Sequence, residues 1–203
     1  LVSTNMKEER LSFTSDIKMI NGSDIIFICV GTPPKDNGKP DLSYVERVSK
    51  QIGDTLENYA VIVEKSTVPV RTADWMRVIL RDRLKTDFDV AVNPEFLREG
   101  TAVKDFFKPD RIIIGTDSPK ADAVLSELYK PLNSPILHMD MQSAELTKHA
   151  SNAALAMRIS FANLVSRGCE ESGADIERVM KGVGLDRRIG PEFLQAGLGY
   201  GGF

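Results

Sequence analysis

The segment 93–115, NPEFLREGTAVKDFFKPDRIIIG, holds the densest group of chemically capable side chains in the chain. Glu95 and Glu99 stand four residues apart, so on a helix they would share one face. Two carboxylates at the exit of a strand suit proton transfer, although surface glutamates are common and the spacing alone is weak. Asn93-Pro94 predicts an extended entry to the segment, which is expected to run straight into another strand.

Two further polar groups follow apolar runs. In Gly31-Thr32-Pro33, the small residue would let a ligand approach the backbone, and the hydroxyl could bond to phosphate or ribose; a plain turn is the alternative. Lys65-Ser66-Thr67-Val68-Pro69 is expected to open a helix, whose free N–H groups favour anions. The alternative is that Thr67 is only the residue capping that helix.

A third group lies further along the chain. Lys148 and Asn152 are four residues apart on a predicted helix, so they could donate jointly to a developing oxyanion. A solvated lysine with an unrelated asparagine is the alternative. Arg187 and Arg188 could bind an anion or be plain exposed charges. The two histidines have no ligand spacing with Cys, Asp or Glu, so no metal site is expected.

The elements that position these groups follow from apolar patterning. Buried strands are predicted at 24–30, 60–64, 88–92 and 111–115, with a weaker one at 135–138. These runs are continuously apolar and β-branched, which is typical of a sheet covered on both faces. Helical spacing separates them, at 42–56, from Pro69 to about Leu84, and at 121–128. Alternating strands and helices indicate an α/β fold with a parallel sheet and right-handed crossovers.

The character of the chain changes near residue 138, which divides it into predicted domains 1–138 and 139–203. Residues 140–172 read as one long helix that stops at Gly173, and a shorter helix is expected at 174–181. The tail is glycine-rich, but its GLGYGG string has no strand before it. It is therefore not a dinucleotide-binding fingerprint.

Composition narrows the class of protein. The chain has 203 residues and a formal net charge of -3, which gives no reason to expect nucleic-acid or membrane binding. No apolar run approaches the roughly 20 residues of a membrane span, and the polar N-terminus does not resemble a signal peptide. Cys29 and Cys169 suggest no disulfide framework. We expect both to be buried or semi-buried thiols in a reducing compartment, the cytoplasm.

Five strings occur in a fixed order: FICVGTP, VEKSTVPV, NPEFLREGTAVKDFFKPDRIIIG, AELTKHASNAALAMRISFAN and GLDRRIGPEFLQAGLGYGGF. Together they resemble the UDP-glucose/GDP-mannose dehydrogenase family, over about Arg10 to Phe203. The resemblance implies a parallel Rossmann-type sheet that lacks its first βαβ unit. A mainly helical central domain would follow, forming a homodimer through the helix at 140–172.

The resemblance also implies a reaction. These enzymes oxidise the 6-hydroxyl of a nucleotide sugar to a carboxylate with two NAD, through a thiohemiacetal and a thioester on a cysteine. UDP-glucose is the favoured substrate; an N-acetylhexosamine nucleotide or GDP-mannose is an alternative. The rival interpretations are a β-hydroxyacid dehydrogenase of the 6-phosphogluconate type and a truncated, inactive nucleotide-sugar-binding or dimerisation module.

Matched motif by motif, the resemblance implies roles for individual residues. The NAD site would be lined by residues at three strand exits: Gly31, Thr32, Pro33, Ser66 and Glu99, the last beside the nicotinamide. The nucleotide sugar would be held by Glu95, Phe96, Leu97, Arg98, Lys148, Asn152, Arg188, Gly199, Tyr200 and Gly201. Thr67 would position a water for proton transfer, and Glu95 would assist thioester hydrolysis. Lys148 and Asn152 would stabilise oxyanions, and Arg188 would reach across the dimer.

The chain also departs from the family pattern. No glycine-rich pyrophosphate loop precedes Leu1, and the nucleophilic cysteine is expected directly after Phe203, so we expect a longer natural chain. Neither cysteine of this sequence matches the nucleophile's position. Arg71 stands where the family usually has Gly, and Leu164 stands where Glu often occurs.

Overall fold

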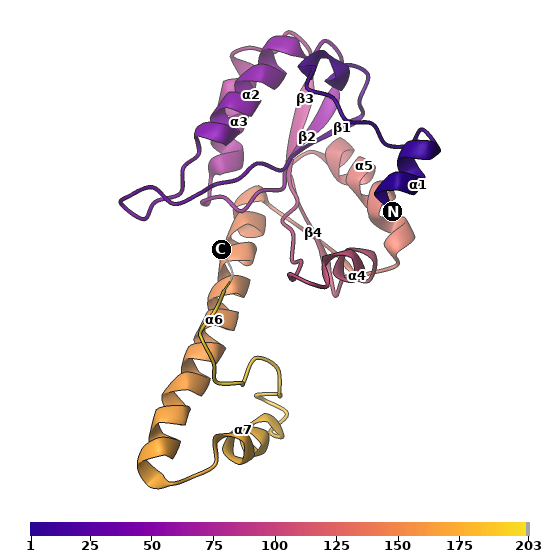
Figure 1. Cartoon of the computed structure of the whole chain (residues 1–203). Coiled ribbons are helices and arrows are strands. Elements are labelled where there is room, and N and C mark those ends of the chain that lie inside the picture. Colours follow the sequence, from indigo (N-terminus) through magenta and orange to yellow (C-terminus); the bar gives the residue numbers. More distant parts are fainter. Residues whose placement is uncertain (202–203) are drawn as a thin grey trace. The chain divides into compact units, whose positions relative to one another are not determined.

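The computed structural model describes residues 1–201, which fall into a first unit, Leu1–Leu146, and a second unit that begins at Thr147. Within the described residues the first unit holds a five-stranded sheet in the order β1-β2-β3-β4-β5 (Figure 1). Its strands are β1 (Ile25–Ile28), β2 (Ala60–Glu64), β3 (Phe88–Val92), β4 (Ile112–Gly115) and β5 (Ile136–Met139). Each lies within two residues of the predicted ends, so the apolar runs located the strands correctly.

The predicted α/β fold with a Rossmann-type, mainly parallel sheet is confirmed, and one strand junction departs from the parallel order. β1, β2 and β3 run parallel, as do β4 and β5, but Val92 of β3 pairs antiparallel with Gly115 of β4. Parallel neighbours need a crossover element that packs back on the sheet. The link from β3 to β4 holds only the short helix α4 (Ala102–Phe107), which has no buried residue. The segment does lead into the predicted strand β4, but α4 lies between the exit of β3 and that strand.

Helices cover both faces of the sheet. The side chains of α2 (Ser43–Thr55) and α3 (Thr72–Arg81) pack on one face, and those of α5 (Pro119–Tyr129) pack on the other. On β2 the buried side chains alternate between the two cores, with Ile62 facing α2 and α3 and its neighbours facing α5. Because both faces of these strands are buried, their side chains are apolar on both sides, and the strands appear in the sequence as continuous apolar runs. Shorter helices are α1 (Val2–Lys7), η1 (Ile17–Ile20) and η2 (Lys130–Leu132).

Helix α3 begins later than predicted. Its N-cap is Arg71 with φ 77, so Pro69 lies before the helix and Thr67 does not cap it. The Glu145 carboxylate instead accepts the backbone N–H of Arg71 at 2.5 Å and that of Ala73 at 2.8 Å. This helix start already binds a carboxylate of the chain itself.

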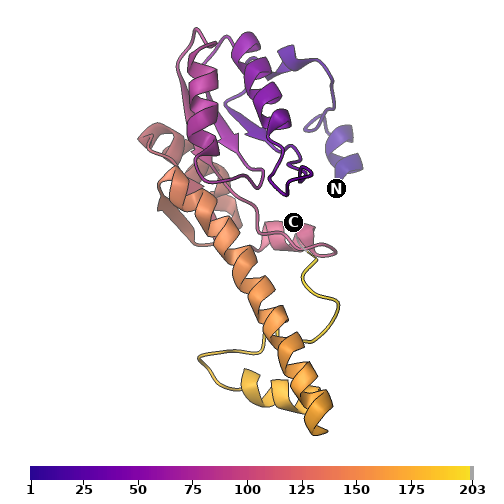
Figure 2. The same cartoon turned by 90° about the vertical axis from the view of Figure 1, so that its left-hand side faces the viewer.

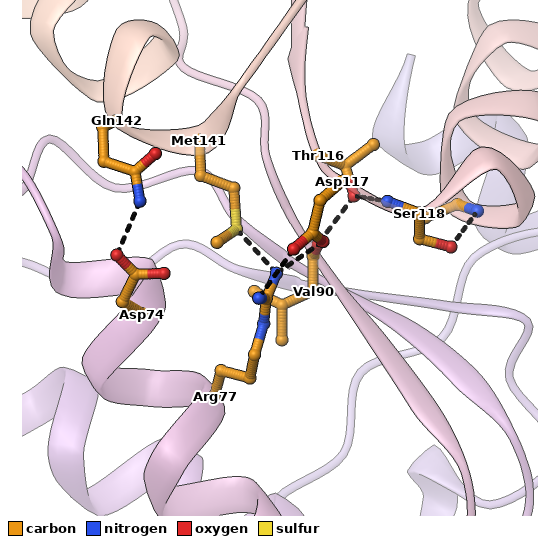
Figure 3. Close-up of polar contacts among 9 residues, drawn as sticks. Asp74, Arg77, Val90, Thr116, Asp117, Ser118, Met141 and Gln142 are labelled. Atoms are coloured by element: carbon orange, nitrogen blue, oxygen red, sulfur yellow. Dashed lines mark hydrogen bonds and ion pairs between the residues drawn. The ribbon is translucent and has the colours of Figure 1, made fainter.

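Long helix α6 (Met141–Ser172) starts in the first unit, where a polar clasp holds its first turn (Figure 3). The Arg77 guanidinium donates to the Asp117 carboxylate at 2.8 and 2.7 Å and lies 3.4 Å from the Met141 sulfur. Beside it, Gln142 donates to Asp74 at 2.6 Å. The clasp therefore joins α3, the loop after β4 and the start of α6.

The second unit is helical. The prediction of one long helix is confirmed by α6, which ends before Gly173, whose φ of 74 suits a glycine stop. Helix α7 (Ile176–Gly184) then packs beside the end of α6 (Figures 1 and 2). Ala162, Met180 and Leu194 form the buried core between them. Among the described residues, no helix combines the length and apolarity needed to cross a membrane.

Candidate functional site

The loops that follow β1 and β2 are joined to each other by hydrogen bonds. Because β1 and β2 run parallel, their carboxyl ends lie at one edge of the sheet, where doubly wound folds bind ligands. Ser66 Oγ accepts the Val30 N–H at 3.0 Å, and the Thr32 hydroxyl donates to the Thr67 carbonyl at 2.9 Å. These bonds bring Thr67, which was predicted to position a water, together with four of the residues predicted to line the cofactor site: Gly31, Thr32, Pro33 and Ser66.

This edge is open at Gly31. The residue is exposed, and a Cβ built on it would meet nothing within 4 Å. Pro33 is also exposed, whereas Thr32 and Ser66 are half-buried. The edge therefore leaves the β1 backbone accessible to a ligand while the hydroxyl groups hold the two loops together.

Asn93, the residue after β3, forms the centre of a buried network that the sequence did not reveal. It is 2% exposed. Its Oδ1 accepts the Tyr129 hydroxyl at 2.5 Å and the Lys65 ammonium at 2.8 Å, and its Nδ2 donates to the Ile113 carbonyl at 2.7 Å. Asn93 thus fixes the third strand end against β2, β4 and α5.

Glu64, the last residue of β2, is a second functional candidate that sequence reasoning missed. Its side chain is fully buried; Oε1 accepts the Ser66 N–H at 2.7 Å, and Oε2 has no hydrogen-bond partner among the described residues. Burial raises its pKa to about 8, against the lowering effect of the Ser66 bonds and with a further increase from Glu145. The carboxyl group is therefore largely protonated at neutral pH. The available signal was an acidic residue closing an otherwise apolar strand.

The segment from Asn93 to Gly100 is irregular, so Glu95 and Glu99 do not share a helix face as predicted. The Glu95 carboxylate instead accepts the backbone N–H of Leu97 at 2.6 Å. Glu99 is exposed in the turn before α4, and the next residue, Gly100, has a φ of 81, which is incompatible with a continuing helix.

The neighbouring aromatic and basic side chains are held in place locally. The Arg111 guanidinium stacks 3.9 Å from the ring centre of Phe96. Arg98 donates from its backbone and its guanidinium to Asp105, at 3.0, 3.0 and 2.7 Å. The Arg98 side chain thereby holds the pKa of Asp105 well below its usual range. Asp105, which the sequence did not single out, keeps Arg98 folded along its own loop, while Leu97 is exposed.

The remaining predicted residues lie in the second unit. Lys148 and Asn152 are on consecutive turns of α6 and therefore on one face, as expected. Lys148 is only 7% exposed, so the alternative of a solvated lysine is wrong. Arg188 is exposed and donates to the Asp186 carboxylate at 3.1 and 2.7 Å.

The glycine-rich tail follows at 197–201. Gly199 has φ 110, Tyr200 is half-buried and Gly201 is exposed. The Gly197 N–H donates to Asn163 of α6 at 2.8 Å. Gly202 and Phe203, which complete the predicted GYGGF string, lie outside the described residues.

The two cysteines differ. Cys169 is buried, as predicted, but Cys29 is exposed, so that half of the prediction was wrong. Cys29 directly follows β1, the first strand in the order of the sheet, where no further strand covers it in the part of the chain described. Within residues 1–201, no group of three His, Cys, Asp or Glu side chains is placed to hold a metal ion.

The comparisons with known proteins identify the family. Residues 1–133 match the profile described as "UDP-glucose/GDP-mannose dehydrogenase family, NAD binding domain". Residues 142–203 match the profile of the central domain of that family. The two matches lie on either side of residue 138, where the sequence changes character.

Curated relatives and solved structures agree with the profiles. The chain is 48% identical over 205 residues to UDP-glucose 6-dehydrogenase TuaD of Bacillus subtilis (strain 168), covering 100% of the chain and 44% of that protein. It is 46% identical to UDP-glucose 6-dehydrogenase of Rhizobium meliloti (strain 1021), covering 100% of the chain and 48% of the relative. The chain thus spans about half the length of these relatives.

The fold agrees as well. The structure of a UDP-glucose dehydrogenase from the hyperthermophilic archaeon Pyrobaculum islandicum superposes with a TM-score of 0.95 at 42% identity, over 99% of this chain and 48% of that one. The chain described here belongs to the UDP-glucose/GDP-mannose dehydrogenase family.

Proposed function

We propose that this chain works as part of an NAD-dependent nucleotide-sugar 6-dehydrogenase that oxidises UDP-glucose to UDP-glucuronate. The observation that carries the proposal is the junction of Gly31–Pro33 with Ser66-Thr67 at one sheet edge, in a chain whose two parts both match the family. The choice of UDP-glucose is supported by the names of the relatives at 46–48% identity.

The sheet edge fits NAD. The backbone at Gly31 is open, and the neighbouring loops are tied by hydroxyl groups rather than by bulky side chains. Gly31, Thr32, Pro33 and Ser66 would line the cofactor site, with Glu99 beside the nicotinamide. When bound, NAD supplies the hydride acceptor for each oxidation.

The chain's own residues would handle charge and protons. An alcohol that loses a hydride develops alkoxide character, which the Lys148 ammonium and the Asn152 amide would stabilise. Because Lys148 is only 7% exposed, its charge is poorly screened by water and acts strongly on a nearby anion. Thr67 would position the water that receives the proton.

The second oxidation would pass through a thiohemiacetal and a thioester on a cysteine expected directly after Phe203. Glu95 would assist the hydrolysis of that thioester by water. The nucleotide sugar would be held by Phe96, Leu97, Arg98, Arg188, Gly199, Tyr200 and Gly201.

A homodimer through α6 is part of the proposal. In the second unit this helix exposes an apolar stripe at helical spacing, formed by Ala150, Ala153, Met157, Phe161 and Leu164. Met157 is 66% exposed and Leu164 is 65% exposed. A continuous apolar helix face of this kind favours burial against a second copy.

The direct test is NADH formation by the full-length protein with UDP-glucose, UDP-N-acetylglucosamine and GDP-mannose in parallel. Two NADH per UDP-glucose, with clear preference over the other two sugars, is the expected result. One NADH per substrate would defeat the thioester route and favour a simple β-hydroxyacid type of dehydrogenase. No NADH with any of the three would leave a nucleotide-sugar-binding or dimerisation module as the better interpretation.

A further inference from the structure

Arg158 lies on α6. All three nitrogen atoms of its guanidinium group donate hydrogen bonds to backbone carbonyl groups of one loop, residues 189–192. Its Nε donates to the Glu192 carbonyl at 2.9 Å, Nη1 donates to the Ile189 carbonyl at 2.8 Å, and Nη2 donates to the Gly190 carbonyl at 2.8 Å. The planar fork of arginine matches several fixed acceptors at once, which an ammonium group cannot do.

The loop that Arg158 holds has an irregular backbone. Gly190 has φ 72 and Phe193 has φ 59, an uncommon conformation for a residue other than glycine. The loop lies against α7, because a Cβ on Gly184 would come within 3.0 Å of the Pro191 Cα. Its carbonyl groups belong to no helix or strand ladder, so Arg158 supplies the donors that such a backbone needs.

The same helix anchors the chain on the far side of this loop. Leu194 is buried against Ala162, one turn after Arg158, and the Gly197 N–H donates to Asn163. The loop therefore has its shape set at both ends by one stretch of α6, before any ligand binds.

The held segment lies between two groups assigned above to the nucleotide sugar. Arg188 directly precedes Ile189, the first residue bonded by Arg158. The glycine-rich tail, 197–201, directly follows the second anchor at Gly197. A change in the loop would displace both.

We propose that Arg158 is a positioning residue for nucleotide-sugar binding: it fixes the loop 189–192 so that Arg188 and the tail at 197–201 are presented to the substrate in advance. This inference rests on the proposed function. Fixing a loop in its bound shape lowers the conformational entropy lost on binding, so the effect belongs to affinity for the sugar nucleotide rather than for NAD.

The test compares Arg158→Met and Arg158→Lys with the wild type in the full-length protein. Calorimetry would measure binding of UDP-glucose and of NAD separately, and hydrogen exchange would follow the amides of residues 186–197. We expect UDP-glucose affinity to fall about tenfold to a hundredfold in both variants, because charged hydrogen bonds to the loop are lost. NAD affinity should stay within about twofold, and the loop amides should exchange faster.

Two further variants sharpen the result. Arg178→Met, which removes an exposed arginine on α7, is the matched control and should bind both ligands as the wild type does. In an Arg188→Ala background, Arg158→Met should cost clearly less affinity than in the wild type, because residues acting through one another are not additive. Additive losses would overturn the positioning role.

Other outcomes also decide the question. Unchanged UDP-glucose affinity in Arg158→Met would overturn the inference while leaving the proposed function standing. Equal losses of UDP-glucose and NAD affinity, together with a lower unfolding midpoint, would show a merely structural role and overturn it as well. If the wild type binds NAD but no nucleotide sugar, the proposed function fails, and the inference fails with it.

Discussion

The Glu145 carboxylate closes the start of α3 by accepting the backbone N–H of Arg71 at 2.5 Å. Its other oxygen accepts the N–H of Ala73 at 2.8 Å, and the side chain is only 2% exposed. A residue from the first turns of α6 thus satisfies the donors that a helix start leaves open. Ala144, the residue before Glu145, belongs to the hydrophobic core on the face of the sheet that α3 covers.

Removal of this carboxylate should destabilise the protein. We expect Glu145→Ala to lower the free energy of unfolding by about 1–3 kcal/mol, because the buried N–H of Ala73 and the partly buried N–H of Arg71 lose their acceptor. Glu145→Gln keeps one acceptor oxygen and should lose less. Urea unfolding measures the change, with exposed Glu170→Ala on the same helix as the control. Equal effects of Glu145→Ala and Glu170→Ala would contradict the capping role.

Glu64 should make stability depend on pH. Its pKa is about 8 in the folded protein, against an ordinary value of 4.5. As pH rises from about 4.5 to about 8, the unfolded chain loses this proton first, so the free energy of unfolding falls. The contribution is at most about 1.4 kcal/mol per pH unit.

The isosteric substitution Glu64→Gln removes the titrating carboxyl group from both the folded and the unfolded protein. Relative to the wild type, the variant should gain roughly 1–3 kcal/mol of stability between pH 5.5 and pH 8. Chemical unfolding of both proteins at several pH values measures this difference. The contributions of the other titrating groups are common to both proteins and cancel in it. A difference that does not change with pH would mean that Glu64 is ionised when folded.

Arg71 adopts a conformation that favours glycine. Its φ of 77 costs a side-chain-bearing residue roughly 1–2 kcal/mol. We therefore expect Arg71→Gly to raise the free energy of unfolding by about 1 kcal/mol, after the larger entropy of glycine in the unfolded chain is deducted. Arg71→Ala keeps the Cβ and should show no such gain, so the pair separates backbone strain from loss of the side chain in a thermal melt.

Asn93 is expected to be the most sensitive polar position in the first unit. Asn93→Ala would remove the acceptor of Tyr129 and Lys65 and the donor to Ile113. The expected loss is about 2–4 kcal/mol, because buried polar groups are left without partners. Tyr129→Phe removes one donor and should cost about 1 kcal/mol by the same urea measurement. Similar losses for the two variants would show that Asn93 is not the centre of the network.

The apolar stripe of α6 predicts the oligomeric state. Met157→Glu would place a charge in the proposed dimer interface and should shift the full-length protein toward monomer in sedimentation velocity. Leu185→Glu places the same charge on a leucine that is 77% exposed after α7, and it should leave the dimer intact. If the wild-type protein sediments as a monomer, the proposed dimer interface is wrong.

Apolar patterning predicted local elements well. β2 and β3 form at the predicted residues because a continuous β-branched run between turn signals has few alternatives to a buried strand. Helix α6 was predicted to within one residue because no glycine or proline interrupts its first turns. These are properties of neighbouring residues, which the sequence displays directly.

Contacts between distant residues were not predicted. The antiparallel junction of β3 and β4 is held by side-chain bonds, from Asn93 to the Ile113 carbonyl and from Thr116 to the Val90 carbonyl. Glu145 lies 74 residues from Arg71 in the sequence, and neither residue type indicates that the two are in contact. The motifs suggested the candidate site residues, which stay predictions, and the residues that support them were missed because their partners are set by tertiary packing.

The neighbour of Asn93 has a consequence for the chemical ageing of the protein. Asparagine deamidates when the backbone nitrogen of the next residue attacks the side-chain amide, but Pro94 has no N–H to lose, so that route is closed. Conversion to aspartate would replace the Nδ2 donor with an oxygen facing the Ile113 carbonyl. The Asn-Pro pair therefore protects the network at the third strand end from the commonest spontaneous damage to asparagine.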